Sequence, residues 1–387
     1  MVEIKNNGTL RFSFPEVHRD AILEIDLKRT LRVPDDGRLN LLPPNLGTFE
    51  MVHVRDYSHR VPDEWVKHGG VMLPMFQSEA MWIRFHSIRE YPFAIKVASG
   101  KCCALTGEDW TDGLAKGERI SKGIITNLQN YLWVPKQPWL DGFNTGDGEI
   151  RQFVAEPMGE GITVEEQLTG EAKNGGLQIQ VFPLKRELWL EHLEEVRRKE
   201  EERRRRDEEL RQRIIENRKK TDTRSWWPWK GNTSKENVCE CRVHDEVLYS
   251  KVYQSVDKAS FMMDCACSIQ ESVTEMGLAA GGRIKQEIYA DPHALTDWDM
   301  KHTSRVFLHL LNAHQWDLVT HRPMPHRPFS ARDYRRHGFK WYDYWAEGTT
   351  LTGSEALAGV KSVAEWDPSL KDADVDEPSV WWTIKEK

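Results

Sequence analysis

Several familiar signatures of enzymes are absent from this chain of 387 residues. It contains no phosphate loop of the Walker type, no dinucleotide-binding glycine fingerprint, no nucleophile elbow and no His-Glu-x-x-His zinc motif. A Phe-Ala-Ile-Lys stretch ending at Lys96 is similar to a kinase strand, but no glycine-rich loop precedes it and no Asp-Phe-Gly follows. The sequence therefore identifies neither a catalytic residue nor a cofactor.

Long hydrophobic runs are also missing. No window approaches the roughly 20 apolar residues that span a bilayer, and the first residues show no basic start followed by an apolar core. The net charge of −7 lacks the basic excess that is typical of duplex-binding domains. We therefore expect a soluble, cytoplasmic protein with no transmembrane segment and no nucleic-acid partner.

Cysteine is scarce, with six residues in the whole chain. Without an export signal, reduced thiols are expected. Two Cys-x-Cys pairs on neighbouring strands would present four thiolates, which suits zinc or copper(I). Structural zinc sites usually have longer spacings, so ordinary thiols are the preferred interpretation. The alternative metal ligands are Cys239, Cys241, Cys265 and Cys267.

Alternating apolar and polar residues dominate most of the chain. In residues 8–34, apolar side chains such as Leu23, Ile25 and Leu27 recur at every second position, which indicates half-buried strands. Similar runs predict strands at 71–76, 80–85, 93–97, 151–154, 162–168, 177–182, 284–289 and 306–310. We therefore predict a single α+β domain over residues 1–387, with a strand-rich, sandwich-like core.

One segment has a different texture. Residues 187–220 contain neither glycine nor proline and carry many opposite charges at helical spacing. Apolar residues lie in heptad register at both ends, but the middle seam positions are charged: Glu200, Arg203 and Asp207. A sustained coiled coil needs more apolar residues. We predict that residues 186–237 form an inserted, solvated helix with a tryptophan-rich loop; contact with a protein partner is the alternative.

Tryptophan is abundant, with 16 residues. Three of them form the loop Trp226-Trp227-Pro228-Trp229 beside several basic residues. Packing of this loop onto the domain is the preferred interpretation, and burial in a protein partner or docking at a membrane surface are the alternatives.

Polar side chains near apolar runs define a candidate ligand site. Buried polar groups need partners, so the turn at residues 77–79 either bonds locally or lines a pocket with glutamines of later strands. Asp297 and Asp299 flank Trp298, as either a sugar platform or a capped turn around a buried ring. The candidate ligand-binding residues are Gln77, Glu79, Trp82, Gln178, Gln180, Gln286, Asp297 and Asp299.

Other titratable residues have simpler interpretations. Glu165 and Glu166 are adjacent on a predicted strand and would point apart. His309 lies between leucines in a predicted strand, where a histidine with satisfied hydrogen bonds is expected.

Seven stretches together resemble a family of uncharacterised proteins shared by bacteria and fungi. They are residues 71–82 (VMLPMFQSEAMW), 151–155 (RQFVA), 163–171 (TVEEQLTGE), the two strands that carry glycine pairs at 175–176 and 281–282, 332–334 (RDY) and 341–344 (WYDY). The resemblance covers most of the chain outside about residues 190–240, a region that is short in the family, and so implies that the charged helix is an insertion. Some members are labelled membrane proteins, which this sequence does not support. The resemblance implies no function. The two glycine-pair strands also resemble each other, either as related halves of a sandwich or by chance.

The expected function is that of a non-catalytic cytoplasmic protein that binds a ligand or self-associates as a homo-oligomer. The alternative is an enzyme without a recognisable motif, acting on a sugar or another small polar molecule.

Overall fold

The structure is a computed structural model that describes residues 2–6, 8–121, 124–146, 148–222, 273–328, 341–345, 348–368 and 381–385. The chain divides into two units, Met1–His192 with Ser272–Lys387, and Leu193–Glu271. The tryptophan-rich loop at 226–229 and the four Cys-x-Cys residues lie outside the described residues.

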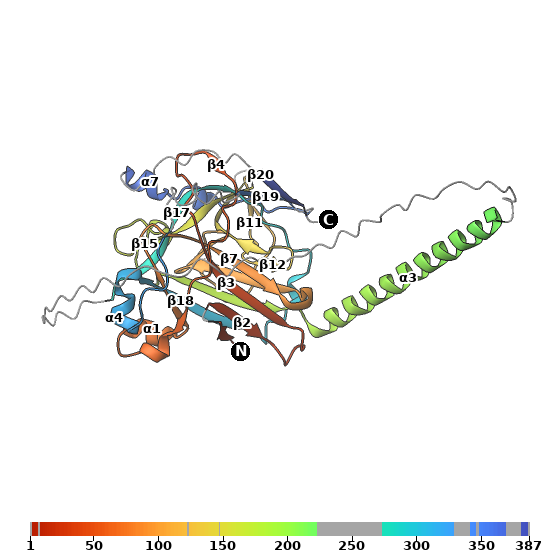
Figure 1. The fold of residues 1–387 in the computed structure, drawn as a ribbon. Coiled ribbons are helices and arrows are strands. Elements are labelled where there is room, and N and C mark those ends of the chain that lie inside the picture. Colours follow the sequence, from red (N-terminus) through yellow and green to blue (C-terminus); the bar gives the residue numbers. More distant parts are fainter. Residues whose placement is uncertain are drawn as a thin grey trace, which may run out of the picture. The chain divides into compact units, whose positions relative to one another are not determined.

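The larger unit is built on one extended sheet whose neighbours along the central path are all antiparallel (Figure 1). In spatial order the path is β1 (Val2–Lys5), β2 (Thr9–Ser13), β3 (Ile22–Thr30), β7 (Ala80–Ser87), β15 (Glu149–Pro157), β17 (Glu275–Lys285), β18 (Ser304–Asn312), β16 (Leu177–Pro183), β8 (Phe93–Ser99) and β12 (Leu132–Val134).

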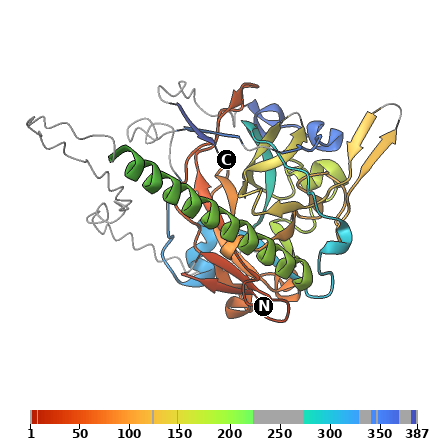
Figure 2. The same cartoon turned by 90° about the vertical axis from the view of Figure 1, so that its right-hand side faces the viewer.

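Shorter strands join this path at its sides, with β4 parallel to β17 and β6 parallel to β18. They are β4 (Leu39–Asn40), β5 (Val52–His53), β6 (Val71–Met75), β9 (Cys102–Cys103), β13 (Trp139–Leu140) and β14 (Gly142–Gly146). Two separate ribbons are β10 (Glu118–Ser121) with β11 (Ile124–Asn127), and β19 (Trp341–Trp345) with β20 (Trp381–Lys385). The β10–β11 ribbon extends away from the main sheet (Figure 2).

The sheet curls around one large apolar core. Phe14, just after β2, and Phe93, at the start of β8, have ring centroids 5.9 Å apart, although β2 and β8 lie near opposite ends of the strand path. The alternating residues Leu23, Ile25 and Leu27 are fully buried in this core. The strand-rich prediction is therefore confirmed. The sandwich-like arrangement is not confirmed, because the described core strands form one open sheet.

The helices are α1 (Asp63–His68), α2 (Val164–Thr169), α3 (Arg186–Asp222), α4 (Trp316–Thr320), α6 (Glu355–Ala358) and α7 (Val363–Trp366). The described residues also form the 3₁₀ helices η1 (Val54–Tyr57), η2 (Ile88–Glu90), η3 (Leu295–Asp297) and η4 (Ala313–Gln315). Within the described residues, no helix is both long enough and apolar enough to cross a membrane.

Helix α2 corrects the sequence-based prediction of a strand at 162–168. The Thr163 hydroxyl accepts a hydrogen bond from the Glu166 amide, and the Glu166 carboxylate accepts one from the Thr163 amide. This reciprocal capping box starts a helix, and Gly170, with a φ of 74°, ends it. The prediction was wrong because apolar residues in so short a segment fit either period.

The two glycine pairs have different structural roles. Gly175 and Gly176 both have a φ of 51° and form the turn before β16. Gly281 and Gly282 instead lie inside β17, where the pairing register with β15 shifts by one residue. A Cβ atom on Gly282 would lie 2.4 Å from the carbonyl oxygen of Pro34. The similarity between the two strands therefore does not reflect equivalent positions.

The long charged helix predicted for residues 187–220 is confirmed as α3. Near its start, Trp189 is buried with its ring 4.8 Å from that of Tyr91. Farther along, Leu210 and Ile214 are 58% and 47% exposed.

Candidate functional site

The structure does not bring the eight predicted ligand-binding residues together in one site. Gln77 and Glu79 belong to the turn between β6 and β7. The Gln77 amide donates to one oxygen of Glu156 (3.0 Å), and the Ser78 hydroxyl donates to the other (2.7 Å). Ser78 has a φ of 63°, which is costly for a residue with a side chain. Burial raises the pKa of the Glu156 carboxyl, and the two hydrogen bonds oppose that rise.

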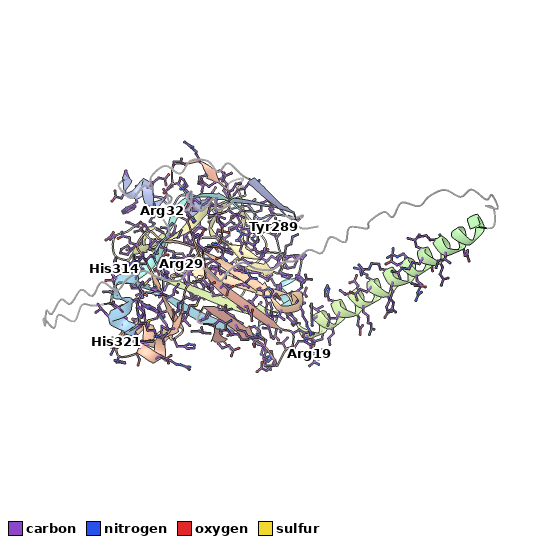
Figure 3. All side chains as sticks on the ribbon, viewed as in Figure 1. Arg19, Arg29, Arg32, Tyr289, His314 and His321 are labelled. Atoms are coloured by element: carbon purple, nitrogen blue, oxygen red, sulfur yellow. The ribbon has the colours of Figure 1, made fainter. Side chains whose placement is uncertain are left out.

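Glu79 is almost fully buried and is held from two sides. Its carboxylate lies 3.5 Å from Nε of Arg29 on β3 and 3.1 Å from Nε2 of His326, and it also accepts the Phe76 amide (3.0 Å). Arg29 is labelled in Figure 3 among the side chains of the sheet. These contacts make Glu79 a bridge between β3, the β6–β7 turn and the segment after α4.

Trp82 and Gln286 also contact other elements of the sheet. Trp82 is half-buried and lies edge-on to Trp139, with ring centroids 6.4 Å apart. The Gln286 side chain accepts the Asp141 amide (3.0 Å) and donates to the Asp141 carboxyl (2.8 Å). Burial raises the pKa of Asp141 to about 7, and the hydrogen bond from Gln286 opposes this.

Asp297 and Asp299 form a capped turn around a buried ring. Trp298 is 1% exposed, and its indole N–H donates to Asp291 (3.0 Å). Asp297 accepts the Ala294 amide (2.9 Å), and Asp299 accepts the amides of residues 301 and 302. The Trp298 ring therefore offers no surface on which a sugar could stack.

The adjacent carboxylates of α2 have structural roles. Glu165 accepts hydrogen bonds from the amides of Lys101, Asn174 and Gly175 and from the Asn174 side chain. Glu166 accepts from the amides of Gly159, Gly161 and Thr163. Each carboxylate therefore satisfies several backbone amides and holds the loops that carry them in place.

His309 is buried, as expected for its place in a strand. Its Nε2 atom lies 3.0 Å from the carbonyl oxygen of Gly69, and its ring stacks on Trp65 with centroids 4.6 Å apart. In the described part of the chain, no group of three or more His, Cys, Asp and Glu side chains could hold a metal ion.

The clearest site is a polar hollow of about 460 Å³, here called the Arg151 hollow. Its lining residues are Asp35, Asp36, Gly37, Arg151, Arg283, Ala364, Glu365 and Pro368. Arg151 on β15 lies directly opposite Arg283 on β17, next to the register shift at the glycine pair. Such bulges re-aim side chains and are frequent beside functional sites.

The buried side-chain amide of Gln152 holds the loop after β3 beside the Arg151 hollow. Its oxygen accepts the Val33 amide (2.8 Å) and its nitrogen donates to the Leu31 carbonyl (2.9 Å). The loop then continues to Asp35, which accepts the Ala364 amide of α7 (2.9 Å). A bridge between Ala280 and Ser362 fixes α7 beside β17.

Arg151 is the residue in the hollow with free hydrogen-bonding capacity. Its side chain is 15% exposed, and its guanidinium lies 3.7 Å from Asp35 and 3.8 Å from Glu365. Neither contact is close enough for a hydrogen bond. Arg283, in contrast, donates to Glu149 (2.8 Å) and to the Gly37 carbonyl (3.1 Å). Arg151 therefore lines the hollow with a guanidinium that makes two ion pairs but no hydrogen bond to an acceptor among the described residues.

None of the residues predicted from the sequence to bind a ligand lies in the Arg151 hollow. Arg151 and Gln152 belong to the RQFVA motif, which carries the resemblance, but neither was selected. No local pattern marks Asp35 or Glu365 as site residues. They are far from Arg151 in sequence, and only the fold places them beside it.

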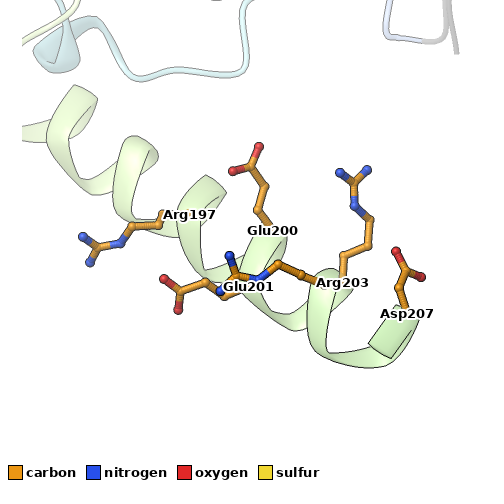
Figure 4. Close-up of a pocket in the computed structure, with 6 residues that line it drawn as sticks. Arg197, Glu200, Glu201, Arg203 and Asp207 are labelled. Atoms are coloured by element: carbon orange, nitrogen blue, oxygen red, sulfur yellow. The ribbon is translucent and has the colours of Figure 1, made fainter. Parts of the chain in front are cut away.

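A second hollow, of about 480 Å³, lies along α3 (Figure 4). Its lining residues all come from that one helix: Arg197, Glu200, Glu201, Arg203, Arg204 and Asp207. Long charged side chains on one helix face are solvated and rearrange freely, so this space is not a built site.

Comparison with known protein families, with curated proteins and with solved structures finds no match to this chain.

Proposed function

We propose that the protein is a non-catalytic binding protein for a small polar molecule that carries one carboxylate and one or more hydroxyl or ammonium groups. The Arg151 guanidinium, largely buried and without a hydrogen-bonded acceptor in the described residues, supports this proposal. Guanidinium and carboxylate groups form paired, charge-assisted hydrogen bonds. The ligand carboxylate would thus bind to Arg151.

The other lining groups suit the donors of such a ligand. Asp36 and Glu365 carry carboxylate oxygens at the edges of the hollow. Hydroxyl or ammonium groups would donate to these oxygens, which also explains why acidic residues surround an anion-binding arginine. A volume of about 460 Å³ lies in the ordinary range for small-molecule sites.

The enzyme alternative has less support at this hollow. A glycoside hydrolase needs one carboxylic acid that keeps its proton near neutral pH. The hydrogen bond from the Ser362 amide and, to a smaller extent, the positive charge of Arg151 instead lower the pKa of Glu365. An ionised Glu365 accepts hydrogen bonds from a ligand but donates no proton.

Self-association through α3 has less support than ligand binding. A parallel pair of helices in register would place Arg203 opposite the same residue of the second copy. In either a parallel or an antiparallel pair, the centre of the seam would consist of the charged residues Glu200, Arg203 and Asp207, where a coiled coil needs apolar side chains. A cytoplasmic location remains part of the proposal, supported by the two buried, unpaired cysteines among the described residues.

The test is a ligand screen by thermal shift and calorimetry, using amino acids and sugar acids at equal concentration. Arg151→Gln should weaken binding of any hit by about tenfold or more, because a charge-assisted pair is lost. Arg55→Gln, at a 79% exposed side chain, is the control and should bind normally. Equal binding by the wild type and Arg151→Gln, or no hit in either class, would refute the proposal.

A further inference from the structure

A row of polar side chains crosses the neighbouring strands β18, β16 and β8, none of which lines the Arg151 hollow. Lys96 on β8, Gln180 on β16 and Arg305 on β18 are directly opposed in antiparallel register. Opposed residues project to the same face, with Cβ atoms about 5 Å apart. The row therefore places a neutral amide between two cations.

Within the described residues, only the nitrogen of the Gln180 side-chain amide forms a hydrogen bond; the oxygen does not. The nitrogen donates to the Thr303 hydroxyl (3.0 Å), but the oxygen is buried and has no hydrogen-bond partner among the described residues. The residue is 9% exposed. A buried acceptor without a donor is unfavourable and rare, so this oxygen indicates a missing donor.

The flanking cations do not supply that donor because they are engaged elsewhere. Lys96, which is 1% exposed, donates to the carbonyl oxygens of Thr111 and Gly113. Arg305 donates to the side-chain oxygen of Gln178. Both cations are therefore held beside Gln180 without bonding to it.

A loop covers this row. The Trp110 ring lies 4.6 Å from the Lys96 ammonium and 4.7 Å from the Arg305 guanidinium. Backbone hydrogen bonds fix the loop base, including that from Trp110 N–H to the Lys101 carbonyl (2.7 Å). The tip is held by Lys96 and by an ion pair between Arg305 and Asp112 (3.6 Å), and it turns at Gly113, which has a φ of 100° and no atom within 4 Å of a Cβ position. An anion that takes over both cations would therefore release the tip.

We propose that the Lys96–Gln180–Arg305 row is a second binding site, for a protonated oxyanion such as hydrogen phosphate or a phosphate monoester. Lys96 and Arg305 would donate to the anionic oxygens. The P–OH group would donate to the free oxygen of Gln180, and the tip of the Trp110 loop would move aside. This site is independent of the ligand proposed for the Arg151 hollow.

The free side-chain oxygen of Gln180 predicts that the site prefers phosphate over sulfate. Inorganic phosphate carries at least one proton at neutral pH, whereas sulfate carries none. A site with a buried acceptor rejects an anion that cannot donate, because the acceptor then stays unpaired beside a negative charge. Phosphate should therefore bind and sulfate should not.

The experiment is calorimetric titration of the full chain at pH 6 with inorganic phosphate, sulfate and glycerol phosphate. Phosphate should bind about tenfold or more tightly than sulfate. The glycerol phosphate arm shows whether the site takes the free anion or a monoester. Gln180→Met should abolish the preference. Arg305→Gln, at a partly exposed residue that should not affect folding, should weaken phosphate binding at least as much, while Arg55→Gln should leave it unchanged.

Three outcomes would overturn this inference: no phosphate binding, equal binding of phosphate and sulfate, or full phosphate binding by both row variants. Arg151→Gln separates the two sites. If that variant alone abolishes phosphate binding, the anion occupies the Arg151 hollow, and the row proposal fails while the hollow remains a ligand site.

Discussion

The buried carboxyl of Asp141 makes the stability of the fold depend on pH. Asp141 lies between β13 and β14, is 2% exposed, and exchanges two hydrogen bonds with Gln286. Burial raises its folded-state pKa from 3.8 to about 7. Between these values the folded state keeps the proton and the unfolded state loses it. The free energy of unfolding therefore falls as pH rises through this window.

The size of the effect follows from the shift. Each pH unit between the two pKa values lowers the free energy of unfolding by about 1.4 kcal/mol. From pH 5 to pH 7 the loss from this residue is about 2 kcal/mol, because half of the folded-state carboxyl is still protonated at pH 7, and the loss approaches about 3 kcal/mol by pH 8, where the curve levels off. Asp141→Asn removes the titration, whatever constant packing cost the amide adds.

The assay is urea unfolding of the wild type and Asp141→Asn at pH 5, 6, 7 and 8. The stability of the variant relative to the wild type should rise by about 3 kcal/mol between pH 5 and pH 8. Asp56→Asn, at a 57% exposed side chain, is the control and should follow the wild-type curve. Parallel curves for the wild type and Asp141→Asn would show that Asp141 is already ionised at pH 5, and would refute the reasoning.

Three further substitutions test how the fold is held, each by its urea midpoint. Glu165→Ala should cost about 2–3 kcal/mol, because it leaves the buried Gly175 amide and the part-buried amides of Lys101 and Asn174 without this acceptor; a shift no larger than that of the exposed Glu171→Ala would contradict this. Thr163→Ala should cost about 1 kcal/mol through loss of the α2 cap, and no change would mean that tertiary contacts alone hold α2. Trp189→Ala should cost about 3–5 kcal/mol as a large buried ring is removed; a cost below 1 kcal/mol would show that the start of α3 does not pack as described.

Local patterns predicted most of the long strands, because one buried face imposes a period of two. The exception is β17, which runs over Glu275–Lys285 rather than the predicted 284–289, and most of the short strands were not predicted. The same reasoning found α3, where charge spacing and the absence of glycine and proline leave little choice. It failed at α2, although the Thr-x-x-Glu capping signal at Thr163 was present.

The candidate site was beyond local reasoning. Gln178 and Gln180 were selected because they occupy the polar positions of an alternating strand. Gln180 belongs to the Lys96–Gln180–Arg305 row, and Gln178 accepts a hydrogen bond from Arg305. Arg151 occupies a similar position on β15 but acquires its meaning from Asp35 and Glu365, more than 100 residues away in each direction. Such pairings depend on tertiary structure, which a single sequence does not display.

The order of strands in the sheet also sets when the chain can fold. Strand β6 pairs with β18, whose last residue, Asn312, is synthesised about 240 residues after Met75. At roughly 5–20 residues per second, β6 waits about 10–50 seconds on the ribosome for its neighbour. Strands β1, β2, β3, β7 and β15 can pair once Pro157 has emerged. The first half of the chain thus assembles early with an open edge at β15, and unpaired strand edges of this kind are where nascent chains aggregate or recruit chaperones.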